Sequence, residues 1–148
     1  MAQSKEVTIG TLAAETGCTV PTIRYYEAIG LLPHASRRAG GHRIYRDADL
    51  QRLSFIRRCR DFGFSIEQVR DFVTLLGSPQ RDCIAARDLT KRHLDAIRGK
   101  LKQLRALQRD LKALVVDCNA QCVGGPAEAC VILEDLALPK SGSCCGPG

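Results

Sequence analysis

Residues 8–27 have the sequence TIGTLAAETGCTVPTIRYYE, which predicts two short helices joined by a tight turn. Thr8 is a residue type that caps the start of a helix, and Gly17 lies where a left-handed residue would end the first helix. The second helix is expected to begin at Thr19 or Val20. A helix, a glycine turn and a second helix form a helix-turn-helix motif.

A β-wing is expected after this motif. Gly40 and Gly41 interrupt a polar stretch, and the following residues have extended character. Two short strands around a glycine turn are therefore predicted over residues 37–46.

Two further helices are predicted after the wing. Asp47 is expected to cap a helix over residues 48–62. Ser65 and Gln68 have the spacing of a capping box, which would start a helix that ends near Leu76.

A long amphipathic helix is predicted from about residue 80 to 116. Its apolar residues recur every three or four positions, close to a heptad pattern: Leu94, Ile97, Leu101, Leu104, Leu107, Leu111 and Leu114. A single apolar stripe of this length needs a partner, which favours a homodimer with paired helices. The alternative is that the stripe packs back onto the N-terminal segment.

The net charge of +6 is concentrated near the wing. Between His34 and Arg60 only two acidic residues accompany eight arginines, which are Arg37, Arg38, Arg43, Arg46, Arg52, Arg57, Arg58 and Arg60. Arginine can direct two N–H groups at one phosphate, so this patch favours nucleic-acid binding over an ordinary solvated surface.

Eight cysteines occur in a chain with no apolar stretch of the roughly 20 residues that span a membrane. We therefore expect a cytoplasmic protein without a membrane partner, in which cysteines bind metal or sense redox state rather than form disulfides. Cys18 and Cys59 have apolar neighbours and are expected to be small buried side chains. Cys144 and Cys145 lie in a Gly/Ser/Pro-rich tail that is expected to be disordered.

The remaining cysteines form the candidate metal site: Cys83, Cys118 and Cys130, with Cys122 as an alternative to Cys118. Cys83 precedes Cys118 by 35 residues, or about 50 Å of helix, so they could meet only across an antiparallel dimer. Thiolates select soft ions such as Zn(II), Cd(II), Pb(II), Hg(II) or Cu(I). His93 lies within the long helix and is expected to be a surface or interface residue.

The string Thr22-Ile23-Arg24-Tyr25-Tyr26-Glu27, with Gly30-Leu31-Leu32 and Arg43-Ile44-Tyr45, resembles the N-terminal region of MerR-type transcriptional regulators. The second helix of such a motif lies in the major groove of DNA and the wing contacts the backbone. The DNA-binding residues expected from this are Thr19, Thr22, Arg24 and Tyr25 on the helix and Arg37, Arg38, His42, Arg43 and Tyr45 on the wing. Tyr26 is expected in the core.

The resemblance also implies a mechanism. In these regulators a residue at the head of the dimerisation helix joins the metal site of the other chain, and a cysteine there, such as Cys83, goes with divalent rather than monovalent ions. Family members bind a promoter as homodimers and distort it so that RNA polymerase can engage. The effector is thus expected to be a soft divalent ion, Zn, Cd, Pb or Hg.

The predicted fold class is mainly α. The expected order is a winged helix-turn-helix DNA-binding domain (1–77), a dimerisation helix that forms an antiparallel coiled coil in the dimer (78–117), a metal-binding loop with a short helix (118–138) and a flexible tail (139–148).

Three other functions would each account for only part of the sequence. An iron–sulfur redox sensor would share the DNA-binding domain, but the C-x3-C-x7-C pattern supplies only three close cysteines. A metal-storage or chaperone module would need the cysteines without the DNA-binding motif. An enzyme is not expected, because the three histidines lie outside the cysteine cluster and no catalytic motif occurs.

Overall fold

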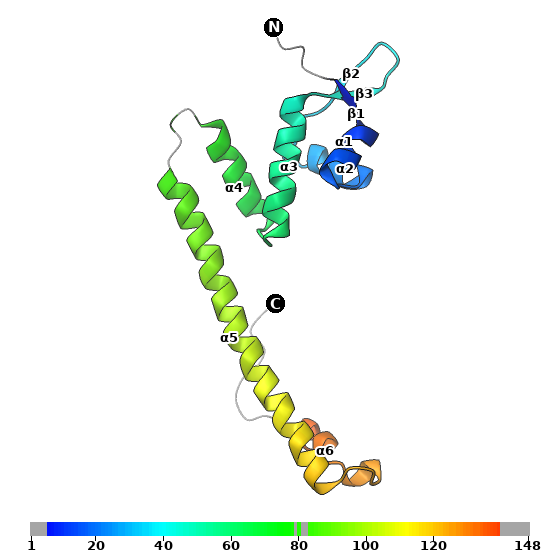
Figure 1. Cartoon of the computed structure of the whole chain (residues 1–148), viewed down its shortest axis with the longest axis vertical. Coiled ribbons are helices and arrows are strands. Elements are labelled where there is room, and N and C mark those ends of the chain that lie inside the picture. Colours follow the sequence, from blue (N-terminus) through cyan, green and yellow to red (C-terminus); the bar gives the residue numbers. More distant parts are fainter. Residues whose placement is uncertain (1–5, 79, 81–82, 140–148) are drawn as a thin grey trace. The chain divides into compact units, whose positions relative to one another are not determined.

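The computed structural model describes residues 6–78, 80 and 83–139 (Figure 1). Its elements, in chain order, are β1 (Val7–Thr8), α1 (Ile9–Thr16), α2 (Val20–Ala28), β2 (Ser36–Arg37), β3 (Arg43–Tyr45), α3 (Asp47–Asp61), α4 (Ile66–Gly77), α5 (Cys83–Gln121), the 3-10 helix η1 (Ala127–Ala129) and α6 (Val131–Ala137). This confirms the mainly α fold class with a small wing and a long helix. The described part of the chain holds no helix that is both long and apolar enough to cross a membrane.

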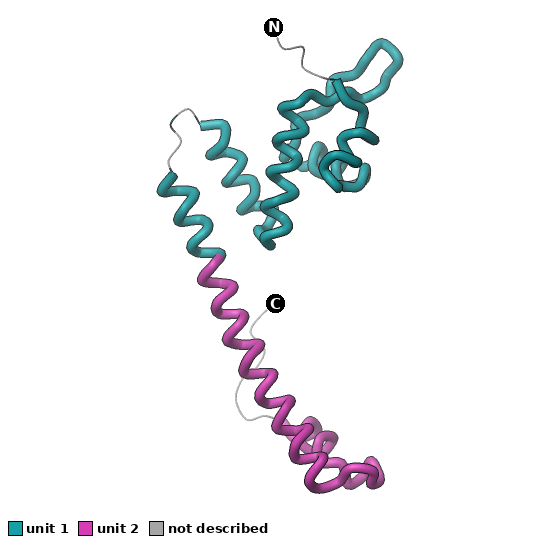
Figure 2. The backbone as a smooth tube through the Cα atoms, in the orientation of Figure 1, with its two compact units in different colours: residues 1–93 teal, residues 94–148 magenta. Residues whose placement is uncertain are grey.

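The chain divides into two compact units, Met1–His93 (unit 1) and Leu94–Gly148 (unit 2), which Figure 2 colours separately. Unit 1 contains the helix-turn-helix, the wing, α3, α4 and the start of α5. Unit 2 contains the rest of α5 and the segment that ends in α6. The domain boundaries expected from the sequence stay a prediction.

The helix-turn-helix forms as predicted, because its ends are set by local hydrogen bonds. The Thr8 hydroxyl accepts from the Thr11 N–H at 3.3 Å, and Thr19 does the same for Thr22 at 3.3 Å. Gly17 adopts φ 68° at the end of α1, a conformation that costs glycine little. These caps place α2 directly after a short turn.

The wing is a three-stranded antiparallel sheet in the order β1-β3-β2. The predicted hairpin is confirmed: Ser36 pairs with Ile44, and Gly41 at φ 80° donates its N–H to the Arg38 carbonyl at 2.8 Å. The strand β1, in which Val7 pairs with Tyr45, was not predicted from the sequence. A strand of two residues is too short to show the alternation that identifies strands.

The residues that start α3 and α4 were both predicted from the sequence, and one of the two predictions is confirmed. Ser65 and Gln68 form the predicted capping box, with bonds of 3.2 and 2.8 Å. The prediction for Asp47 is wrong: Arg46 is the N-cap of α3, and the carboxylate of Asp49 accepts from the Arg46 N–H at 2.8 Å. Asp49 lies three residues after Arg46, the distance at which a side chain reaches back to the cap.

Unit 1 has a closed hydrophobic core. Its fully buried side chains come from the helices, the wing and the loop after α2: Leu12, Ile23, Leu31, Leu32, Tyr45, Leu53, Ile56 and Val69. Tyr26 is buried as predicted, with 6% of its surface exposed. Because α1, α2, β3, α3 and α4 all contribute to one core, they hold the recognition helix and the wing in a fixed relation.

α5 extends five residues further than predicted and ends at Gln121. Its apolar stripe is exposed in unit 2, with Leu104 at 60% and Leu111 at 61%. Among the described residues of unit 2 no side chain is buried. A single chain therefore leaves this apolar surface in water.

The segment after α5 turns back on itself and ends in the predicted short helix, α6 (Figure 1). Gly124 adopts φ 77°, and the Gly125 N–H donates to the Cys122 carbonyl at 3.0 Å. A Cβ on Gly125 would lie 3.2 Å from that carbonyl oxygen, so the close approach favours glycine. Val131 of α6 and Leu114 of α5 then line one groove.

Candidate nucleic-acid interface and metal centre

The exposed face of α2 carries the predicted recognition residues. Arg24 and Tyr25 are exposed, Tyr25 at 51%, whereas their neighbours Ile23 and Tyr26 are buried. The hydroxyls of Thr19 and Thr22 lie 2.7 Å apart at the start of the helix. The core thus fixes one face of α2 and leaves the other free for a ligand.

The wing presents part of its predicted set. Arg37, Arg38 and His42 are exposed, and Arg38 forms a salt bridge with Glu6 at 2.5 Å. Arg43 is half-buried, with its Nε 3.7 Å from the carboxylate of Glu27. Arg37 and Arg38 therefore place positive charge on the exposed surface of the hairpin.

Tyr45 has a structural position in this fold. Its side chain is completely buried, and its hydroxyl donates to Glu27 Oε1 at 2.9 Å. Burial raises the pKa of Tyr45, and the hydrogen bond to Glu27 raises it further, so the phenol stays a neutral donor. Because its ring lies in the core and its hydroxyl is bonded to Glu27, Tyr45 holds the wing against the core. It is therefore not available for the DNA contact expected from the sequence.

Glu27 has a role that was not predicted from the sequence. It is 3% exposed and accepts from both the Tyr45 hydroxyl and the Ala35 N–H, the latter at 3.1 Å. A buried carboxylate is stable only when it is hydrogen-bonded or paired. Glu27 thus ties α2 to both sides of the wing. The sequence signal that could have identified this role is the position of Glu27 next to Tyr26, which was expected in the core, near the end of a short helix.

Three of the eight arginines serve the fold rather than a free basic surface. Arg52 donates to the Leu31 carbonyl at 2.9 Å, Arg57 donates to the Gly17 carbonyl, and Arg60 donates to the Phe64 carbonyl. Each closes a turn or a helix end with a charged donor. Of the other five, Arg37, Arg38 and Arg43 belong to the wing, whereas Arg46 and Arg58 are exposed at α3.

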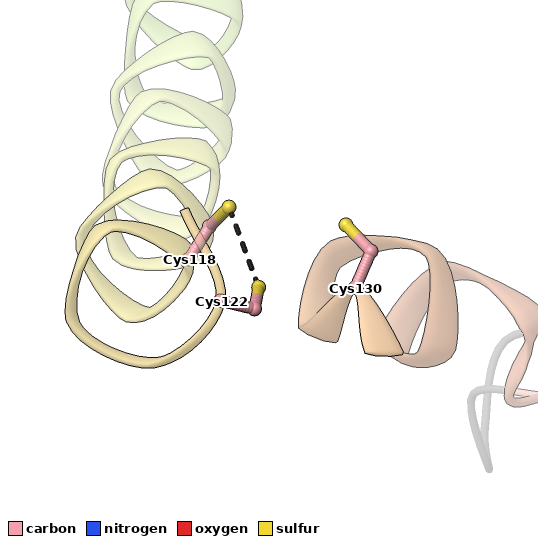
Figure 3. A group of neighbouring side chains, drawn as sticks. All are labelled: Cys118, Cys122 and Cys130. Carbon is pink, nitrogen blue, oxygen red and sulfur yellow. Dashed lines mark hydrogen bonds between the residues drawn. The ribbon is translucent and has the colours of Figure 1, made fainter. Parts of the chain in front are cut away.

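Three cysteines of unit 2 form a cluster at the end of α5 (Figure 3), hereafter the thiol cluster: Cys118, Cys122 and Cys130. Their sulfur atoms all lie within 4.8 Å of one another, and all three residues are half-buried. Cys118 and Cys122 are one helical turn apart, and the Cys122 thiol donates to Cys118 Sγ at 3.6 Å. The loop through Gly124 and Gly125 brings Cys130 opposite them.

The surroundings of the thiol cluster affect its members differently. The hydrogen bond from Cys122, with desolvation, raises the pKa of the Cys118 thiol. The backbone N–H groups of Leu133 and Ile132 lower the pKa of Cys130. Cys130 therefore becomes a thiolate at lower pH than Cys118, and a bound cation would draw the remaining protons from the cluster.

A soft metal ion fits this arrangement. Zinc–sulfur bonds of about 2.3 Å place two sulfurs of a tetrahedral site about 3.8 Å apart. The separation of 3.6 Å between Cys118 and Cys122 is close to that value, and the other pairs lie within 4.8 Å. Small shifts of side chains would suffice to close three sulfurs around one ion.

The other cysteines lie elsewhere. Cys83 is exposed at the first residue of α5, whereas the thiol cluster lies at the far end of that helix. Cys18 and Cys59 are buried, as predicted, and burial raises the pKa of Cys59. Cys144 and Cys145, whose role was left open, lie outside the described residues.

His93 makes contacts inside unit 1. Its Nε2–H donates to the Phe62 carbonyl at 2.9 Å, and its ring lies over Phe64 with the centroids 4.2 Å apart. Gly63, between them, has φ 81°. His93 thus fixes the start of α5 to the turn between α3 and α4.

Comparison with known proteins finds similar proteins over most of the chain. Residues 7–76 match the family described as MerR HTH family regulatory protein, and residues 50–114 match the one described as MerR, DNA binding. The HTH-type transcriptional regulator ZntR of Escherichia coli strain K12 is 36% identical over 137 residues, or 90% of this chain and 94% of that protein. Heavy metal-dependent transcription regulator 1 of Rhizobium meliloti strain 1021 is 33% identical over 127 residues, 86% of this chain and 84% of the other.

A solved structure matches the fold. The crystal structure of the transcription regulator PbrR691 from Ralstonia metallidurans CH34, in complex with lead(II), has a TM-score of 0.77 and 37% identity. The match covers 88% of this chain and 99% of that one. The likeness therefore includes the helix-turn-helix, the wing and the long helix together.

Proposed function

Because the chain belongs to the MerR family of helix-turn-helix regulatory proteins, we propose that it activates transcription when a soft divalent metal ion binds its cysteine thiolates. The observation that carries this proposal is the thiol cluster, which places three soft donors within 4.8 Å on the same chain as a DNA-binding motif. Two relatives support it by name: one is heavy metal-dependent, and the other was solved with lead(II).

The protein binds promoter DNA through α2 and the wing. Arg24, Tyr25 and Thr19 face the major groove, where arginine can recognise a guanine edge. Arg37, Arg38 and His42 contact the phosphate backbone, which positions the motif without specifying sequence. Thr22 and Arg43 complete the interface at its edge.

The protein acts as a homodimer. Burying a leucine side chain contributes about 1.5–3 kcal/mol, and α5 exposes a whole stripe of such residues. Pairing two α5 helices antiparallel would cover both stripes and bring the head of one helix to the tail of the other. Cys83 of the partner subunit would then reach the thiol cluster of the first chain.

Metal binding supplies the energy for activation. An ion held by the thiol cluster and by Cys83 of the partner subunit cross-links the two chains, which changes the angle between the two DNA-binding units. Smooth bending of a promoter costs on the order of 1–6 kcal/mol. Structural zinc sites contribute about 10–16 kcal/mol, so a modest difference in affinity between two states is enough to drive that change. RNA polymerase then engages the distorted promoter.

The test is a competition titration of the reduced protein with Zn(II), Cd(II), Pb(II), Hg(II) and Cu(I), followed by transcription from an operator promoter. We expect a divalent ion to bind at one per chain and to activate transcription, and Cys83→Ser to abolish activation. Thr90→Ser, a conservative exposed change on the same helix, serves as the control. Activation that survives in Cys83→Ser, or a protein purified with iron and sulfide, would refute the proposal.

A further inference from the structure

The thiol cluster contains three sulfurs, one more than each chain would contribute to a three-coordinate site shared with Cys83 of the partner subunit. Cys118 and Cys122 were alternatives at the level of sequence, yet both project toward Cys130 (Figure 3). Residues four apart on a helix share one face, and the Cys122 N–H still donates to the Cys118 carbonyl at 3.0 Å. Either sulfur can therefore reach an ion at this position without excluding the other.

All the parts that hold these three sulfurs together belong to one chain. Cys118 lies in α5, and Cys122 directly follows the last residue of that helix. The glycine turn returns Cys130 to the same side. The Gly125 and Cys130 N–H groups close this turn onto the Cys122 and Ala127 carbonyls, at 3.0 and 3.1 Å. The geometry of the cluster thus exists without a contribution from a second subunit.

We propose that a single protomer captures the metal ion through Cys118, Cys122 and Cys130, and that Cys83 of the partner subunit is needed for signalling but not for capture. This inference rests on the proposed function. In the capture step the ion replaces the protons of three thiols, so that M²⁺ and three R–SH give M(SR)₃⁻ and three H⁺.

The proposal also defines the class of ion. Three thiolates complete the coordination of a large soft ion such as Pb(II), whereas tetrahedral Zn(II) needs a fourth ligand. An ion of the Pb(II) class is therefore bound by one chain alone. Zn(II) binds tightly only when Cys83 of the partner subunit, or another donor, completes the tetrahedron.

The experiment uses the full-length protein with Cys144→Ser and Cys145→Ser, so that the tail supplies no sulfur. Pb(II) is titrated into this parent and into variants with Cys83→Ser, Cys122→Ser or Asn119→Ser added, and the sulfur-to-lead charge-transfer absorbance is followed. We expect Cys83→Ser and Asn119→Ser to keep one Pb(II) per chain with nearly parental affinity. Cys122→Ser should bind about 100-fold more weakly, the order of effect of losing one of several ligands.

Two further measurements separate the possible failures. If the parent binds Pb(II) and activates transcription but Cys83→Ser loses binding as severely as Cys122→Ser, the inference is wrong and the proposed function stands. If the parent neither binds a soft divalent ion nor responds to one, the proposed function itself is wrong. Should Cys122→Ser not fold, X-ray absorption on Pb(II)-loaded Cys83→Ser decides: three sulfur neighbours support the proposal, and two overturn it.

Discussion

Unit 1 and unit 2 differ in how many of their apolar side chains each buries within a single chain. Unit 1 buries a core to which helices and wing both contribute, and its buried carboxylate, Glu27, has hydrogen-bond partners. The described part of unit 2 buries no side chain, although it exposes leucines along α5. Unit 1 thus has the interior of a small independent domain, whereas the described part of unit 2 leaves an apolar surface exposed, which the proposed dimer would cover.

A charge placed on the α5 stripe should have the largest effect. Leu104→Glu removes about 1.5–3 kcal/mol of burial from each chain of the proposed dimer and adds a desolvated carboxylate. We expect dimer dissociation to rise by at least about 100-fold, as measured by sedimentation, with loss of operator binding. Lys102→Glu, on the opposite face of the helix, should leave the dimer intact. Equal effects of the two changes would remove the basis for assigning the stripe to the interface.

The stability of unit 1 depends on the two hydrogen bonds that Glu27 accepts. Glu27→Ala leaves the Tyr45 hydroxyl and the Ala35 N–H without their acceptor, at a cost of about 2–3 kcal/mol. Urea unfolding measured on the wing and helix-turn-helix should show this loss of stability, whereas the exposed Glu15→Ala should change little. A loss below about 0.5 kcal/mol, the size of an ordinary surface effect, would mean that Glu27 does not hold α2 to the wing.

His93 gives a smaller effect at the end of unit 1. His93→Ala removes a hydrogen bond to the Phe62 carbonyl and a ring contact with Phe64, together worth about 1–2 kcal/mol. Hydrogen exchange should become faster in the first turns of α5, while Arg92→Ala, an exposed neighbour, should not have this effect. Unchanged exchange in His93→Ala would show that other contacts fix the start of the helix.

The smallest expected effect is a difference in reactivity between two cysteines of the thiol cluster, Cys130 and Cys118. Since backbone N–H groups lower the pKa of Cys130 and the hydrogen bond from Cys122 raises that of Cys118, Cys130 has the larger thiolate fraction near pH 7. Alkylation of the metal-free protein, mapped by mass spectrometry, should modify Cys130 several-fold faster than Cys118. The difference should shrink as the pH rises above both pKa values. Faster modification of Cys118 at neutral pH would contradict the assignment.

Much of unit 1 was predictable because its signals are local. Thr8, Thr19 and Ser65 cap helices through hydrogen bonds to N–H groups three residues away, and Gly17 ends α1 through its own backbone freedom. The same holds for the apolar stripe of α5, whose periodicity is a property of the sequence itself. Asp47 was assigned wrongly at this level: the N-cap lies one residue earlier, at Arg46, and Asp49 reaches back to accept from the Arg46 N–H.

The tertiary structure decided which residues meet. Whether Tyr45 faces DNA or the core depends on the distant Glu27, and whether Arg52 and Arg57 bind DNA or carbonyl groups depends on turns far along the chain. At the thiol cluster, the sequence supplied the cysteines and the glycine loop but left Cys118 and Cys122 as alternatives. Only the folded turn shows that both can face Cys130, because a distance between two side chains depends on the path of the backbone that joins them and not on residue types alone.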